Sequence, residues 1–339
     1  QQEDSMDIPG EKLVIKMWDS LVDKGIGGVL QPWQERRVGE CRLDFRQREI
    51  LKIAEAEKLA DDIRKGKIQF SNPQLENFIG NRQGRIEPVL SLEDVITSTI
   101  KNDMGEALRK EANVAKSILI AEDLLADDDT PVNEQNIDDD WLFNWREYAG
   151  RVSSEDLQQL WGKILAGEIK QPGSYSYRTL DFLKTLSKSD AEIIANAAQF
   201  VIDGVIFREH DEILVKSGIN FGVLMYLQEL GILSGVEAVG LSSDWKSVKS
   251  DSFLKAFISY NHCLILEHDN PNKVAKKPIY LVSSIGKQVL SLAQFGANKE
   301  YLKAVGCSFV KQGFTVKLAD WIQQTQNTGR FYNAEAIVA

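Results

Sequence analysis

Apolar and polar residues alternate at helical spacing most clearly between residues 141 and 186. One predicted helix face carries the apolar side chains Leu157, Leu160, Trp161, Ile164, Leu165 and Ile169. The polar side chains expected on the opposite face are Gln158, Gln159, Lys163 and Glu168. Ser153 stands before this pattern as a predicted N-cap, and Pro172-Gly173 follows it as a turn signal. The pattern therefore predicts one amphipathic helix with a defined start and stop.

Two further helix starts follow the same logic. Ser176 precedes one apolar run, and Ser187 precedes another with Asp190 three residues later. Helices joined by short connections are typical of small helical domains. We therefore expect a central helical domain over residues 137–205.

A second apolar stripe lies near the N-terminus, on a helix predicted to start at Glu11. Its members are Leu13, Val14, Met17, Trp18, Leu21 and Val22. Three acceptors are compatible with so much apolar surface: the central domain, a second copy of the chain, or a membrane surface. The polar face mixes lysines with acids, which disfavours the membrane. We expect the stripe to drive self-association into a homo-oligomer, with contacts through Leu13, Met17, Trp18 and Leu21.

The chain after this helix is densely charged and only loosely periodic, as in a long exposed helix or a coiled-coil arm. The predicted N-terminal arm spans residues 11–68 and follows a disordered tail at residues 1–10. Residues 69–136 are expected to hold a loop at 72–88, then a helix interrupted near Gly105, then an acidic linker.

The acidic linker is the most charged segment of the chain. Residues 122–140 contain nine acids and no Lys or Arg. The central glycine and final glutamate of a calcium-binding loop are absent. Acids also suit the N-terminus of the helix expected near Trp141. We expect a solvated linker and a helix start, with no metal and no cofactor.

Residues 206–296 mix helical and β-rich patterns. Asn220–Gly231 reads as a helix with four apolar residues facing inward, namely Phe221, Leu224, Leu227 and Leu230. His262–His268 and Ile279–Val282 read as two strands joined by a turn, and Ser283 or Ser284 caps a further helix. Helix, hairpin, helix resembles a winged-helix module, followed by a C-terminal extension at 297–339. The predicted fold class is mainly α with a C-terminal α+β winged-helix-like domain.

Composition indicates a globular protein, with 43% hydrophobic and 27% charged residues. The formal net charge of −10 disfavours broad binding to nucleic acid or anionic membranes. Three cysteines lie far apart without a CxxC pair, which suggests reduced thiols and a cytoplasmic location. No apolar run is long enough for a transmembrane segment, and no leader pattern indicates secretion.

The block LQQLWGKILAGEIKQPGSYSYRTL, residues 157–180, resembles the signature of a bacterial family of unknown function. That family shares an LWxKILAGE helix, a Pro-Gly-Ser turn and a Ser-x-Arg-Thr-Leu helix start. The strong resemblance covers about 138–187, and a looser one extends to Leu292. A weaker similarity runs to alpha-type abortive-infection proteins, in which a comparable helix pair precedes a C-terminal domain. The resemblance implies a phage-defence context and no particular chemistry.

Candidate functional side chains are few. Lys273, Lys276 and Lys277 form the local basic cluster that a nucleic-acid contact would use, although three lysines on a turn more often form a solvated loop. His262 and His268 lie too far apart along one strand to share a metal ion, and Cys263 points to the other face. Arg178 and Glu168 could form a site, with Arg178 contacting a partner, or Arg178 could bridge helix ends or carbonyl groups at the PGSYS turn.

These observations favour a non-catalytic interaction or scaffold protein, in the context of phage defence, that binds an unidentified protein partner. A nucleic-acid-binding regulator acting through the C-terminal module is the alternative. A hydrolase with an unrecognised site is the third hypothesis. The enzyme hypotheses are disfavoured because no nucleophile, base or metal motif is recognisable.

Overall fold

The computed structural model describes residues 10–27, 42–65, 67, 92–238, 241–324 and 328–338, without the side chains of 42–49 and 92–95. The tail expected before residue 10, the loop expected at 72–88 and Cys41 lie outside the described residues. The chain divides into two compact units, Gln1–Leu180 and Asp181–Ala339, which are considered separately. The first is helical and the second contains antiparallel sheets, as the sequence predicts at this coarse level.

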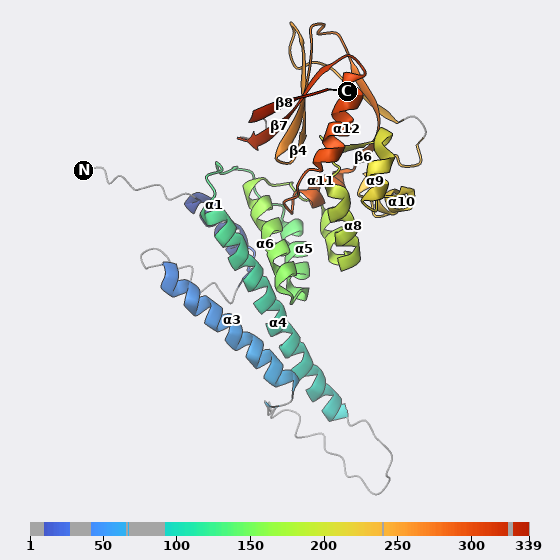
Figure 1. Ribbon diagram of the computed structural model, residues 1–339. Coiled ribbons are helices and arrows are strands. Elements are labelled where there is room, and N and C mark those ends of the chain that lie inside the picture. Colours follow the sequence, from blue (N-terminus) through green and yellow to red (C-terminus); the bar gives the residue numbers. More distant parts are fainter. Residues whose placement is uncertain are drawn as a thin grey trace, which may run out of the picture. The chain divides into compact units, whose positions relative to one another are not determined.

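The first unit is assembled along one long helix. Its helices are α1 (Glu11–Val22), α3 (Arg42–Arg64), α4 (Leu92–Ala126), α5 (Asp139–Arg151) and α6 (Glu155–Lys170). The 35-residue α4 packs against each of the other four, as Figure 1 shows. Helix α7 (Tyr177–Thr185) crosses the boundary between the units. The first unit therefore ends inside the region that the sequence assigned to one central domain.

Close helix contacts explain how the first unit is packed. Gly162 on α6 faces α4 so closely that a Cβ atom there would lie 2.6 Å from the Ile120 side chain. Trp145 and Trp161 are fully buried between the helices, and the indole N–H of Trp145 donates to the Trp161 carbonyl at 2.9 Å. The indole therefore fills the core without leaving its polar atom unpaired.

Helix α4 is continuous through Gly105, so the predicted interruption there is wrong. A Cβ atom on Gly105 would lie 3.4 Å from the carbonyl oxygen of Ala60 on α3. The glycine thus lets α3 approach α4 and does not end the helix. At the next predicted signal, Ser154 rather than Ser153 is the N-cap of α6, and its side chain makes no capping bond. Ser176 does cap as predicted, since the N–H of Thr179 donates to its hydroxyl at 3.3 Å.

The second unit contains short helices and eight strands among its described residues. The helices are α8 (Lys188–Ala198), the 3-10 helix η2 (Arg208–His210), α9 (Asp211–Lys216), α10 (Phe221–Glu229), α11 (Ser284–Leu290) and α12 (Lys299–Val310). The strands are β1 (Val205–Phe207), β2 (Leu233–Ser234), β3 (Ser242–Trp245), β4 (Phe253–Ser259), β5 (His262–His268), β6 (Ala275–Val282), β7 (Thr315–Gln323) and β8 (Gly329–Ile337).

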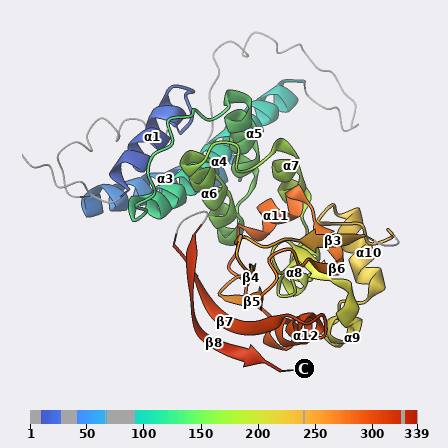
Figure 2. The same cartoon turned by 90° about the horizontal axis from the view of Figure 1, so that it is seen from above.

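These strands form two antiparallel sheets. One has the order β1-β6-β2, with β3 also pairing β6, and the other has the order β4-β5-β7-β8. Helix α12 packs against β5, β7 and β8 (Figure 2). Its Phe309 stacks on Phe257 of β4, with ring centroids 5.4 Å apart. Its Tyr301 hydroxyl donates to the Phe207 carbonyl and accepts from the Phe207 N–H, which ties α12 to β1.

The hairpin expected between His262–His268 and Ile279–Val282 does not form. Strand β5 pairs with β4 and β7, whereas β6 pairs with β1, β2 and β3, so the two segments lie in different sheets. Ser283 caps α11 as predicted, accepting from the Gly286 N–H. Phe221 was expected inward, but as the first residue of α10 it is 61% exposed.

Candidate functional site

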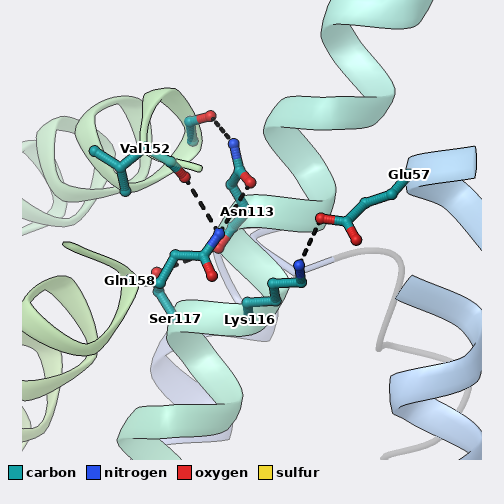
Figure 3. A network of polar contacts seen from close by, with 7 residues as sticks. Glu57, Asn113, Lys116, Ser117, Val152 and Gln158 are labelled. Carbon is teal, nitrogen blue, oxygen red and sulfur yellow. Dashed lines mark hydrogen bonds and ion pairs between the residues drawn. The ribbon is translucent and has the colours of Figure 1, made fainter. Parts of the chain in front are cut away.

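Asn113 is the centre of a buried polar network in the first unit (Figure 3). Its amide nitrogen donates to the carbonyl of Gly150 at 2.8 Å, and its amide oxygen accepts from Gln158 at 3.1 Å. Gln158 also donates to the carbonyl of Val152 at 3.3 Å, and Ser117 donates to the Asn113 carbonyl at 3.2 Å. The network therefore joins α4 to the end of α5 and the start of α6. Buried amides paired in this way fix one relative placement of these helices.

An ion pair joins α3 to the same part of α4. The Lys116 ammonium donates to Glu57 at 2.5 Å, and both side chains are partly exposed (Figure 3). Solvent screens such a pair, so its contribution to stability is small. Its role is to help fix the register of α3 on α4.

A hollow of about 650 Å³ adjoins this network, between α3 and α4. Its charged lining comprises Glu57, Lys58, Asp61, Arg64, Glu106 and Arg109. Asn102, Asn113 and Ser153 complete the polar wall, and Gly105 and Ala60 also line the hollow. The described lining contains no histidine, and its only lysine is Lys58 on α3. Equal numbers of acids and bases suit polar contacts with a protein better than capture of an anion.

Glu168 forms the second buried polar cluster of the first unit. Its carboxylate accepts from the backbone N–H of Gly173 at 2.5 Å and of Tyr175 at 3.0 Å. Burial raises the pKa of the Glu168 carboxyl, and these backbone donors oppose that rise. A Cβ atom on the neighbouring Gly167 would lie 2.7 Å from the Tyr175 ring, so glycine is needed for the turn to fold back. Glu168 therefore holds the Pro-Gly-Ser turn against the end of α6.

The start of α5 is fastened to the same turn. Asp138 is the N-cap of α5, accepting from the Trp141 N–H at 2.8 Å. The Tyr177 hydroxyl also donates to the Asp138 carboxylate, and this bond raises the pKa of Tyr177 to about 12. The Trp141 indole donates to the Tyr175 carbonyl at 2.7 Å. The acidic residues before α5 thus act as a helix start, as the sequence predicts.

The structure places the predicted interaction residues of α1 in the core of their own unit. The side chains of Leu13, Met17, Trp18 and Leu21 are at most 4% exposed. Helix α1 packs against α4 and α6, and the Trp18 indole donates to Glu122 of α4 at 3.1 Å. This stripe is therefore covered by the central helices of the same chain and is not free to meet a second copy.

Arg178 is exposed at the start of α7 and has no hydrogen-bond or ion-pair partner within the described ranges. Among the described residues, no hydrogen bond joins Arg178 to a carbonyl of the PGSYS turn, and the Tyr175 carbonyl accepts from the Trp141 indole instead.

The three lysines proposed for nucleic acid are each engaged within the second unit. Lys273 donates to the Gly313 carbonyl at 2.9 Å and lies over the Phe314 ring. Lys276 pairs with Asp244 at 3.6 Å. Lys277 is only 5% exposed and pairs with Glu209. Of the three, Lys277 is the least able to reach an external phosphate.

His262 and Cys263 of β5 are buried within the second unit. His262 lies 3.4 Å from Asp320 of β7, and burial lowers the pKa of its imidazole. Burial raises the pKa of the Cys263 thiol to about 11, so it is a poor nucleophile. Among the residues with described positions, no group of three His, Cys, Asp or Glu side chains could hold a metal ion.

The sequence pattern placed Gln158 and Glu168 on the polar face of the helix, and Glu168 was predicted to act only together with Arg178. Gln158 and Glu168 are both nearly fully buried, whereas Leu157 is 40% exposed. The face of α6 that meets the other helices is therefore rotated from the one that apolar spacing alone indicates. The available signal for Glu168 was Gly167, since a glycine beside an acid near a helix end permits a close return of the chain.

A family model described as "Protein of unknown function (DUF2806)" matches residues 102–215. The match begins in α4 and contains the Asn113 network, the Glu168 cluster and Arg178. It supports kinship with an uncharacterised family over that part of the chain. Comparison with curated proteins and with solved structures found no match. None of the described helices is both long and apolar enough to cross a membrane.

Proposed function

We propose that this protein is a non-catalytic interaction or scaffold protein that docks a helical protein partner. The observation that carries the proposal is an exposed apolar stripe on α4. Ile96, Ile100 and Met104 stand four residues apart and are 36%, 41% and 41% exposed. Residues at this spacing lie on one side of a helix. The stripe is therefore continuous along the first described turns of α4.

The same side of α4 is covered by α5 further along. Ile96 and Val114 are about five turns apart at 3.6 residues per turn, so they share a face. Val114 is buried, and the Cβ position of Gly150 on α5 lies 3.5 Å from its side chain. Figure 1 shows α4 running beyond α5 and α6 alongside α3. A partner helix seated on the stripe would continue the contact that α5 makes.

The phage-defence context of the proposal rests on the weak resemblance to abortive-infection proteins. It is tested by quantitative co-purification of the tagged full chain from bacterial cells with and without phage infection. The test variant replaces the stripe, I96S/I100S/M104S, and the control is L157S, which changes an equally exposed leucine on α6.

The proposal expects a specific partner that the stripe variant loses and the control retains, with more partner recovered after infection. A partner retained by the stripe variant contradicts docking at α4. Equal recovery with and without phage contradicts the phage-defence context. Thermal midpoints of the three proteins establish that the substitutions leave the fold intact.

A nucleic-acid-binding regulator is the second candidate, favoured by one observation. The order α8, β1, α9, α10, β2, β6, with the sheet order β1-β6-β2, is compatible with a winged helix that has an insertion before its last strand. Helix α10 would then be the recognition helix. Its exposed residues include Phe221, Tyr226 and Glu229, and it carries no Lys or Arg. That surface suits protein contacts better than phosphates.

Titration of the full chain with duplex DNA at several salt concentrations tests this alternative. The regulator hypothesis predicts binding that weakens steeply with salt and a further loss in K273E/K276E. We expect neither. Lys277 is left unchanged, because a glutamate there would face Glu209 and disturb the fold.

A further inference from the structure

Strand β8 is ordered but buries little of itself within its own chain. Seven consecutive residues, from Arg330 to Ala336, are exposed on both faces of the strand. They include Phe331 at 53% and Tyr332 at 46%, beside Ile322 of β7 at 53%. Figure 2 shows β7 and β8 as a long ribbon at one side of the sheet. A strand that covers so little apolar surface gains little to offset the entropy of ordering it.

The two edge strands of this sheet, β4 and β8, differ in how far their outward-facing backbone groups are hydrogen-bonded within the chain. At the β4 edge the chain supplies its own partners: Leu254 bonds through its carbonyl to the Val248 N–H and through its N–H to the Ser247 hydroxyl. The carbonyl of Ile258 accepts from the Asp203 N–H at 2.7 Å. Within the described ranges, no backbone hydrogen bond reaches the outer edge of β8.

The β8 edge carries two charged side chains of opposite sign, Arg330 and Glu335. It contains neither Lys nor Pro over its nine residues. Its one irregularity is a bulge at Asn333, which has a φ of 51° and donates to Asp320 at 2.9 Å. The bulge divides the edge into a first arm, residues 330–332, and a second arm, residues 334–336.

Because of the bulge, the charged residues of the two arms lie on the same face of the strand, and their charges are opposite. Glu335 pairs with Leu318 and Tyr332 pairs with Asp320, and these two β7 residues share a face. Tyr332 and Glu335 therefore share that face, and so does Arg330, which pairs with Ile322. One arm thus carries an exposed cation and the other an exposed anion on the same side of the strand.

We propose that β8 pairs antiparallel with β8 of a second copy of this chain, continuing the sheet across a two-fold axis. This deepens the proposed scaffold function by naming a self-association surface. Antiparallel pairing about a two-fold sets the first arm of each copy against the second arm of the other. Arg330 then comes within cross-strand reach of Glu335 of the second copy, twice per dimer. Phe331 and Ala336 share the opposite face, since they pair with Trp321 and Lys317 of β7.

The self-complementary charges allow a test by reversal and rescue. Sedimentation equilibrium is measured on the full chain and on R330E, E335R, the double variant R330E/E335R and an equal mixture of the two single variants. K249E, an exposed charge change in the loop before β4, is the matched control. Thermal midpoints establish that each variant is folded.

The proposal expects a wild-type dimer of twice the 38.1-kDa chain mass. Each single reversal should weaken dimerisation about tenfold in Kd, because like charges then face each other at both ends. The double variant and the mixture should both regain the wild-type Kd, and K249E should keep it. Backbone amide exchange in β8 should slow as the protein concentration rises.

A wild-type chain that is monomeric at all concentrations overturns this inference, and so does a dimer that neither single reversal weakens. Failure of both the double variant and the mixture to recover overturns it as well. These outcomes are separable from the proposed function. A monomer that still loses its partner in the α4 stripe variant keeps the docking role, whereas a β8 dimer without any captured partner keeps only the self-association.

Discussion

The indole nitrogen of Trp145 on α5 donates to the backbone carbonyl of Trp161 on α6 at 2.9 Å, with both side chains fully buried. The Trp161 ring also lies against Tyr148, with ring centroids 5.7 Å apart. This pair connects the two helices that the long α4 supports. Loss of this hydrogen-bonded pair should therefore destabilise the first unit as a whole.

Replacing Trp161 with Ala should lower the free energy of unfolding by about 3–5 kcal/mol, because a large buried side chain leaves a cavity. Urea unfolding followed by circular dichroism measures the change. Leu157→Ala on the same helix is the control, and its 40% exposure predicts a much smaller loss. Equal losses for the two variants would show that α6 is packed differently.

Asn113→Ala should cost about 2–4 kcal/mol, because the Gly150 carbonyl and the Gln158 amide lose a buried partner. A double-mutant cycle with Gln158→Ala should show a coupling of about 1 kcal/mol or more. Asn144→Ala, which removes the solvent-exposed hydrogen bond from a half-buried amide on α5 to the Asp140 carbonyl, is the matched control. Simple additivity of the Asn113 and Gln158 changes would contradict a shared network.

Glu168 gives the first unit a defined pH dependence. Its folded pKa is raised above the ordinary 4.5, so the folded state binds the proton more tightly than the unfolded state. Stability from this group is then fully present below pH 4.5 and declines as the pH rises through the raised folded value. Glu168→Gln removes this titration while keeping an acceptor oxygen for the Gly173 N–H.

The measurement is the difference in unfolding free energy between wild type and Glu168→Gln, determined from pH 4 to pH 7. We expect the unfolding free energy of the wild type to fall relative to that of the variant as the pH rises through that window. A difference that grows in favour of the wild type over the same window would mean that the folded pKa is lowered, contrary to the burial of this carboxyl.

Comparing alanine substitutions at Gly10 and Gly173 distinguishes the cost of a steric clash from the cost of a positive φ. Both have a positive φ, 73° and 85°, so alanine at either position costs about 1–2 kcal/mol of conformational strain. A Cβ atom at Gly10 would also lie 2.0 Å from the Leu125 carbonyl, whereas nothing lies within 4 Å at Gly173. Thermal unfolding should show a distinctly larger loss for Gly10→Ala. Similar losses would mean that α1 does not begin against the end of α4.

Local signals predicted the helices well and the long-range contacts poorly. Ser187 forms the predicted capping box with Asp190, and the Asn220 side chain caps α10. These features depend on residues within one turn of each other. By contrast, the partners of β5 and β6 depend on pairing across many residues, which strand pattern alone does not encode.

The functional residues were harder to predict for a related reason. Apolar spacing placed the N-terminal stripe on an amphipathic helix, and we expected that stripe to bind a second copy rather than the chain's own core. Met17 is fully buried, so the helix belongs to the core. The contacts of Glu168 could not be predicted because its hydrogen-bond donors are backbone N–H groups of a turn, which have no residue signature in the sequence.

The central claim, docking of a partner helix on the α4 stripe, is tested most directly by methionine oxidation in the captured complex. Met104 is 41% exposed in the free chain, so dilute peroxide should oxidise it readily, whereas buried Met17 should resist. Mass spectrometry of the complex should show Met104 oxidation slowed several-fold, with partly buried Met225 on α10 unchanged. Oxidation of Met104 at the same rate in the free and captured protein would contradict docking on α4.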